Sequence, residues 1–73
     1  MSTDKTATVD IGPEGIRLGQ LIKFVGAVDT GGEVKILLES GLVRVNGNVE
    51  SRRGLQLRTG DIVAIAGRSW QLA

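Results

Sequence analysis

The chain has 73 residues, of which 41% are hydrophobic and 23% are charged, and its formal net charge at pH 7 is +1. This length supports one modest core rather than two domains, and the balanced charge argues against a disordered tail or a strongly basic arm. Neither cysteine nor histidine is present, which excludes disulfides, zinc knuckles and thiol nucleophiles and removes the commonest general base.

Two further features of the composition limit the class of protein. Aromatic residues make up only 3% of the chain, which argues against modules that stack several bases on aromatic rings. The longest apolar run, residues 62–66, is far shorter than the roughly 20 residues that cross a bilayer, and the first residues do not resemble a signal peptide. We therefore expect a soluble cytoplasmic protein without a membrane partner.

The first part of the chain predicts a short strand and a helix. Residues 1–6 are expected to form a loose end, and the alternation in residues 7–11 predicts a strand. After the turn residues 12–15 comes an amphipathic helix that ends near Gly26. Phe24 is expected to widen the buried stripe of this helix, whose residues follow the spacing i, i+3, i+4 and i+7: Leu18, Leu21, Ile22 and Val25.

A second helix has a capping signal at its start. Thr30 and Glu33 match a capping box, in which the two side chains each accept a hydrogen bond from a free backbone N–H. Gly41 stands where a glycine commonly ends a helix. The helix is therefore short, about two to three turns, and must lean on the first helix for stability. Its predicted apolar face is Val34, Leu37 and Leu38.

The Asn-Gly pair at 46–47 is the strongest hairpin signal in the chain. A two-residue turn at this pair mixes polar and apolar residues on both faces of the hairpin. A three-residue loop instead pairs Val45 with Val49 and Arg44 with Glu50, which sorts the two faces. We favour the three-residue loop, with Arg44 facing outward.

The remaining residues predict further short strands and turns. In chain order they are a basic turn at 52–54, a strand at 55–58, a turn at 59–61, a strand at 62–66, a tight turn at 67–68 and a last strand at 69–72. Helices followed by strands, without an internal repeat or linker, predict a single α+β domain over residues 1–73. Trp70 is expected in the core or at its edge, and the predicted core includes Leu18, Leu21, Ile22, Val25, Leu37, Leu38, Val43, Val45 and Val63.

The distribution of charge favours an anionic partner over catalysis. Residues 1–40 hold four basic and six acidic residues, whereas residues 41–73 hold five arginines and two acidic residues. The planar guanidinium of arginine suits phosphate oxygens. No serine has a histidine to activate it, the carboxylates are scattered, and the glycines at 26 and 31 are not followed by the lysine of a phosphate-binding loop. We expect a protein that is not an enzyme and needs no cofactor.

The pattern of residues 17–63 resembles the RNA-binding domain named after small-subunit ribosomal protein four, the S-four domain or αL motif. Its most recognisable pieces are Val-Arg-Val-Asn-Gly at 43–47 and Gly-Asp-Ile-Val at 60–63. Gly-Gly-Glu at 31–33 and the arginine pair at 52–53 are similar to its short stand-alone bacterial branch, the YbcJ-like proteins. Two positions depart from the family pattern, because many members have an aspartate where this chain has Gly19 and an arginine where it has Gly31.

The resemblance implies two antiparallel helices packed on a small sheet of short strands, with structured RNA against the second helix and the turn after the hairpin. No local acid is expected to pair with the arginines of that turn, whereas Lys35 could pair with Glu39. We expect the protein to be a monomer and its partner to be ribosomal or transfer RNA. The matching basic positions are Arg17, Lys35, Arg44, Arg52, Arg53 and Arg58.

Recognition of the RNA is expected to depend on its shape and phosphates, with little base preference, because no aromatic residue is expected on this face. A ubiquitin-like sulfur carrier has a similar hairpin, but its chemistry needs a Gly-Gly carboxyl end, whereas this chain ends Gln-Leu-Ala at 71–73. A second alternative stays open. The same fold could serve as a protein–protein adaptor with an acidic partner.

Overall fold

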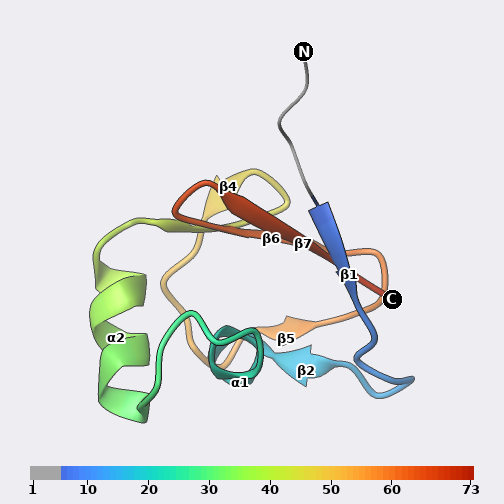
Figure 1. Cartoon of the computed structure of the whole chain (residues 1–73), viewed down its shortest axis with the longest axis horizontal. Coiled ribbons are helices and arrows are strands. Elements are labelled where there is room, and N and C mark those ends of the chain that lie inside the picture. Colours follow the sequence, from blue (N-terminus) through green and yellow to red (C-terminus); the bar gives the residue numbers. More distant parts are fainter. Residues whose placement is uncertain (1–5) are drawn as a thin grey trace.

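The computed structural model describes residues 6–73 and shows the predicted α+β arrangement of two helices and several short strands (Figure 1). Residues 1–5 of the expected loose end lie outside the described range, and Thr6 already belongs to the first strand. In chain order the elements are β1 (Thr6–Val9), β2 (Ile16–Arg17), α1 (Leu18–Phe24), α2 (Gly31–Glu39), β3 (Val43–Val45), β4 (Asn48–Val49), β5 (Gln56–Leu57), β6 (Ile62–Ile65) and β7 (Arg68–Leu72).

The strands form two sheets. A five-stranded sheet has the order β1-β7-β6-β3-β4, in which β1 runs parallel to β7 and the other neighbours are antiparallel. A separate antiparallel pair joins β2 to β5, so the segment before α1 lies beside a segment some forty residues later in the chain. In Figure 1 the five-stranded sheet lies in the upper half of the molecule, with both helices and the β2–β5 pair below it.

The hydrophobic core fills the space between the large sheet and the helices. Alternate residues of the sheet point into it, because successive side chains of a strand face opposite sides. Of the predicted core, Val25 and Leu37 are only half-buried at its margin, and the other seven residues are buried. The buried residues are Leu18, Leu21, Ile22, Val34, Leu38, Val43, Val45, Leu57, Val63, Ile65, Trp70 and Leu72.

The capping box predicted for the second helix is confirmed. The backbone N–H of Glu33 donates to Oγ1 of Thr30 at 3.3 Å, and Oε1 of Glu33 accepts from the backbone N–H of Thr30 at 3.1 Å. The same oxygen accepts from the N–H of Asp29 at 2.9 Å. These backbone hydrogen bonds, first that of Asp29, lower the pKa of Glu33. Gly41 follows the helix with a φ of 79°, as its position at the helix end requires.

The expectation that Phe24 joins the buried stripe is wrong, because 67% of this residue is exposed. An α-helix turns by about 100° per residue, so Phe24 points roughly 110° away from the centre of the stripe that Leu18, Leu21, Ile22 and Val25 form. Phe24 is also the last residue of α1. It therefore projects into solvent at the end of the helix.

The register predicted for the hairpin is also wrong. The structure pairs Val45 with Asn48 and Arg44 with Val49, which leaves a two-residue turn at 46–47. The sorting of faces does not decide the register here, because β4 is a two-residue edge strand that is exposed along its length. Arg44 does face outward, as expected.

Backbone geometry and one side chain determine this turn. Asn46 and Gly47 have φ values of 51° and 88°, and a two-residue hairpin turn of this type needs positive φ at both positions. Nδ2 of Asn46 donates to Oδ1 of Asp61 at 3.1 Å, while its Oδ1 accepts from the N–H of Ile62 at 3.0 Å. The turn is thus tied to the start of β6.

The tight turn that was expected at 67–68 lies one residue earlier. Ala66 and Gly67 form it, with φ values of 49° and 90°, and Arg68 already belongs to β7.

Within the described residues, neither helix has the length and apolar character needed to cross a membrane.

The helix faces can be tested by comparing buried and exposed positions. Leu21 is fully buried, so we expect Leu21→Ala to lower the free energy of unfolding by about 2–5 kcal/mol. Leu37→Ala should cost less, because Leu37 is only half-buried. Urea unfolding followed by the fluorescence of Trp70, the one tryptophan in the chain, measures these losses. Phe24→Leu is the control and should change the stability by less than about 0.5 kcal/mol. Equal losses for Leu21→Ala and Phe24→Leu would contradict the assigned faces.

Candidate nucleic-acid interface

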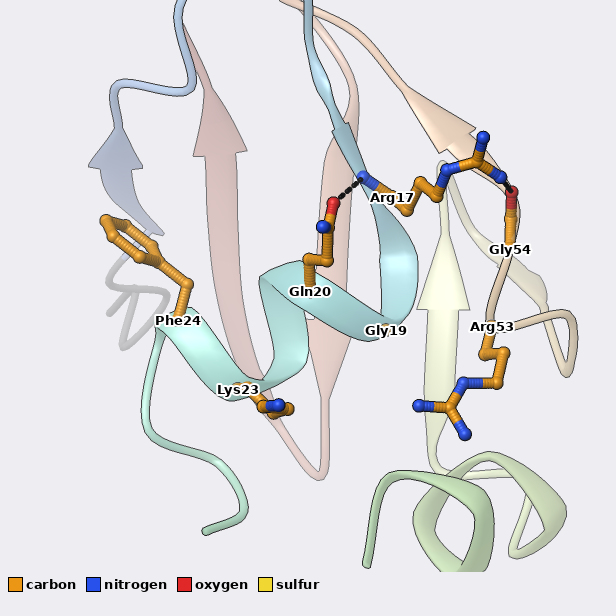
Figure 2. Close-up of a pocket in the computed structure, with 7 residues that line it drawn as sticks. All are labelled: Arg17, Gly19, Gln20, Lys23, Phe24, Arg53 and Gly54. Atoms are coloured by element: carbon orange, nitrogen blue, oxygen red, sulfur yellow. Dashed lines mark hydrogen bonds between the residues drawn. The ribbon is translucent and has the colours of Figure 1, made fainter. Parts of the chain in front are cut away.

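The face of α1 that is turned away from the core forms one side of a cleft. Gln20 and Phe24 lie on this face three and seven residues after Arg17, and Lys23 lies beside Phe24. All four side chains are exposed. The cleft measures about 460 Å³, and Figure 2 shows the residues that line it: Arg17, Gly19, Gln20, Lys23, Phe24, Arg53 and Gly54.

The other side of the cleft is the turn before β5, which is bonded directly to the start of α1. The N–H groups in the first turn of a helix have no partner within the helix. Here the N–H of Leu18 donates to the carbonyl of Leu55 at 2.9 Å, and the N–H of Gly19 donates to the carbonyl of Arg53 at 2.8 Å. A side chain at Gly19 would place its Cβ only 3.3 Å from that carbonyl oxygen. Glycine at this position therefore permits the close approach of the turn to the helix.

The side chain of Arg53 extends from the start of α1 toward the start of α2. Its Nε lies 3.5 Å from the place that a Cβ on Gly19 would take, and its Nη2 lies 3.8 Å from the corresponding place at Gly31. The two glycines that depart from the family pattern are thus the residues beside which this guanidinium lies. The guanidinium of Arg53 thus places a positive charge near the start of α2, although residue 31 is a glycine and not an arginine. Lys35 is four residues after Gly31 and so lies one turn further along the same helix face.

Three cations line the cleft. Arg17, Lys23 and Arg53 form no ion pair with any of residues 6–73. Arg17 is held in place by its own backbone and by the turn. Its N–H donates to Oε1 of Gln20 at 3.2 Å, and its Nη1 donates to the carbonyl of Gly54 at 3.4 Å. The cleft is therefore suited to an anionic ligand.

Arg52 differs from its neighbour Arg53, because it is paired. Its Nε and Nη2 donate to the two carboxylate oxygens of Glu50 at 2.9 and 3.2 Å. The expectation that no local acid pairs with either arginine of the turn is therefore wrong for Arg52. The side-chain hydrogen bonds of Arg52, helped by its backbone N–H, lower the pKa of Glu50 to about 2, and the pair raises the pKa of Arg52.

The remaining predicted site residues lie at different places. Lys35 is exposed on α2, and no ion pair joins it to Glu39 in the described part of the chain. Arg44 lies on the outer face of the large sheet, beside Ala64 of β6, and its Nη1 donates to the carbonyl of Gly47 at 3.4 Å. Arg58 follows β5, whereas Arg53 precedes it.

Among the six predicted residues, the structure thus brings Arg17 and Arg53 into one cleft, whereas Lys35 lies on α2 one helical turn after Gly31, the residue that Arg53 approaches. Lys23 and Phe24 also line the cleft and were not selected from the sequence. Their signal was the helical spacing itself, because Phe24 is seven residues after Arg17 and Lys23 is three residues after Gln20.

Comparison with known proteins yields matches over most of the chain. A family model described as the S4 domain matches residues 9–73. A Bacillus subtilis protein named "Probable ribosome maturation protein RlbA" is 39% identical over 59 residues, which cover 81% of this chain and 83% of the relative. YbcJ of Escherichia coli is 35% identical over 57 residues, which cover 78% of this chain and 81% of the relative.

A solved structure also matches. The solution structure of Escherichia coli YbcJ, reported to contain an αL motif involved in RNA binding, superposes with a TM-score of 0.71. The two chains are 31% identical in this superposition, which covers all of this chain and 94% of YbcJ. The α+β fold and the arrangement of short strands are therefore shared with that protein.

The ion pair beside the cleft predicts an unusual titration. Glu50 should titrate at a pH of about 2, far below its ordinary value of 4.5. Because the folded pKa is the lower one, the pair adds stability above the ordinary pKa and loses it as the pH falls toward the folded pKa. Carboxyl chemical shifts followed by NMR across this range test the value. In Arg52→Gln we expect the Glu50 titration to return toward 4.5, whereas Arg53→Gln, the matched control, should leave it unchanged. A Glu50 midpoint near 4.5 in the unmodified protein would show that the pair does not form in solution.

Proposed function

The chain belongs to the S4 domain family, and we propose that it is a non-catalytic RNA-binding protein that holds structured RNA through the basic cleft between α1 and the turn before β5. Membership of this family, with its αL fold and similarity to the YbcJ branch, confirms the resemblance drawn from the sequence. The observation that carries the proposal is the presence of Arg17, Lys23 and Arg53 around one cleft without an ion-pair partner in the described residues.

Phosphate is the chemical group that these side chains suit best. Guanidinium groups donate in a planar fork that matches phosphate oxygens, and lysine adds a compact positive charge. Arg17 is already oriented by its bond to the carbonyl of Gly54, and Arg53 is held near Gly19 by its backbone. The guanidinium of Arg17, which is already bonded to the protein, loses less side-chain entropy on binding than a free side chain does.

Not every predicted arginine contributes equally to the proposed interface. We assign the main contacts to Arg17, Arg53 and Lys35, and add Lys23. Arg52 is expected to contribute less, because a phosphate must compete with Glu50 for its guanidinium. RNA contact by Arg44 and Arg58 stays a prediction. Both residues lie outside the cleft, so they can contact only an RNA large enough to wrap around the domain.

The RNA is proposed to be ribosomal or transfer RNA in the cytoplasm, bound by a monomer. Similarity to a relative named for ribosome maturation supports ribosomal RNA as the first RNA to test for binding. The alternative function, an adaptor for an acidic protein, uses the same charges. It becomes the better interpretation if the purified protein binds no structured RNA at any ionic strength.

The salt dependence of binding tests the phosphate contacts. With three to five contacts at about 0.9 per contact, the slope of log affinity against log salt for a duplex RNA should be about −3 to −4.5. Arg53→Ala should weaken binding by about tenfold or more and flatten this slope by about one unit, for RNAs of different sequence alike. Fluorescence anisotropy of a labelled RNA duplex over a series of salt concentrations measures both quantities.

Arg44→Ala is the matched control, because it also removes one exposed arginine but from the outer face of the large sheet. We expect it to change the affinity and the slope much less than Arg53→Ala does. Neither substitution should change the free energy of unfolding by more than about 0.5 kcal/mol. If Arg44→Ala abolished binding while Arg53→Ala had no effect, the interface would lie on the sheet and not at the cleft.

A further inference from the structure

Phe24 is an aromatic ring placed in the basic cleft without a packing role. Its side chain is one of the large apolar groups left exposed, with 67% of the residue accessible to solvent. Single exposed apolar residues are common and need no explanation by themselves. Phe24 differs from the others, such as Ile36 and Val49, because it lies in one cleft with three cations that form no ion pair within residues 6–73.

The cleft has a charged end and an aromatic end. Arg17 and Arg53 both line the cleft near the start of α1, where Arg17 bonds to Gly54, and Phe24 is at the end of the helix (Figure 2). Seven residues of helix separate Arg17 from Phe24, a rise of about 10 Å. Lys23 lies next to Phe24, and Gln20 lies between the two ends.

Gln20 adds hydrogen-bond donors to the middle of the cleft. Its Oε1 accepts from the backbone N–H of Arg17 at 3.2 Å, which fixes the orientation of the amide. The two N–H donors of its Nε2 have no hydrogen-bond partner in the described residues, and Gln20 lines the cleft. Pockets of about 300–1,000 Å³ are typical of small-ligand sites, so a cleft of about 460 Å³ has room for one nucleotide.

We propose that this cleft takes one unpaired nucleotide of the bound RNA, with its phosphates at Arg17, Arg53 and Lys23 and its base stacked on Phe24. This inference rests on the proposed RNA-binding function and adds a class of RNA to it. A base inside a duplex is already stacked on its neighbours and cannot offer its face to Phe24, so the nucleotide must come from a bulge, loop or strand end. Stacking accepts any base, because every base has a π face, and sequence preference therefore stays weak.

The sequence predicts no aromatic residue on the RNA-binding face, whereas Phe24 lines the cleft to which we assign RNA binding. For the paired part of the RNA, we still expect recognition of its shape and phosphates. The single stacked base selects where along a duplex the domain binds.

Binding to three RNA duplexes of the same sequence tests the inference. One duplex is fully paired, one has a single bulged adenosine, and one has a bulged abasic nucleotide, which keeps the extra phosphate but removes the base. We expect the adenosine bulge to bind about 5- to 150-fold more tightly than the abasic bulge, which corresponds to about 1–3 kcal/mol at 1.4 kcal/mol per tenfold. Phe24→Leu should remove the preference for the adenosine bulge over the abasic bulge, whereas Phe24→Trp should keep it.

A direct signal comes from the ring itself. Phe24 is the one phenylalanine in the chain, so incorporation of 4-fluorophenylalanine gives a single fluorine resonance at this site. We expect that resonance to shift on addition of the adenosine bulge and to stay in place with the abasic bulge. Ile36→Ala, which trims a similarly exposed apolar residue outside the cleft, is the protein control and should change neither measurement.

The possible outcomes separate this inference from the proposed function. If all three duplexes bind equally and with the same salt slope, the nucleotide site is wrong and RNA binding stands. If none binds, the proposed function fails as well. Adenosine monophosphate should not compete at the concentrations where the bulged duplex saturates the protein. Competition at those concentrations would overturn the assignment to RNA and indicate a site for a free nucleotide.

Discussion

The junction between α1 and the turn before β5 depends on two backbone hydrogen bonds. The N–H groups of Leu18 and Gly19 donate to carbonyls of Leu55 and Arg53, so a distant loop satisfies the first two N–H groups of the helix, while the side chain of Gln20 accepts from the N–H of Arg17. A Cβ at position 19 would lie 3.3 Å from the carbonyl oxygen of Arg53, which is a tight contact, so glycine favours this closure. The closure also determines where the side chain of Arg53 begins, beside the helix start and pointing toward α2. The charged cleft is therefore a product of backbone geometry, and its cations are placed by the fold and not only by composition.

Local patterns in the sequence predicted the helices well, whereas contacts between distant segments account for the wrong hairpin register. The capping box at Thr30 and Glu33 and the buried stripe of α1 depend on contacts a few residues apart, which sequence spacing describes directly. The hairpin register failed because Asn46 bonds to Asp61 and Ile62, fifteen or sixteen residues away, and because the edge strand β4 has no buried face to sort. The pairing of β2 with β5 is likewise a long-range contact that no local pattern showed.

The candidate site was predictable in composition but not in arrangement. Six basic residues were selected from the sequence, and the structure distributes them over the cleft, α2, the outer sheet face and the end of β5. Two adjacent arginines also acquire different roles, because Arg52 bonds to Glu50 whereas Arg53 lies against two glycines. A neighbouring acid two residues before Arg52 was visible in the sequence. Which of the two arginines it would engage depended on the direction of the backbone in the turn.

The parallel pairing of β1 with β7 has a consequence for how the domain folds. Thr6 lies opposite Ser69, about sixty residues later in the chain, whereas the hairpins of β3 with β4 and β6 with β7 join near neighbours. Bringing distant segments together costs more chain entropy than closing a hairpin, and contacts of long sequence separation slow folding. During synthesis, β1 emerges first and must wait for residues 68–72 before it can pair. We therefore expect β1 to be the last strand to join the sheet and the first to exchange its amide hydrogens.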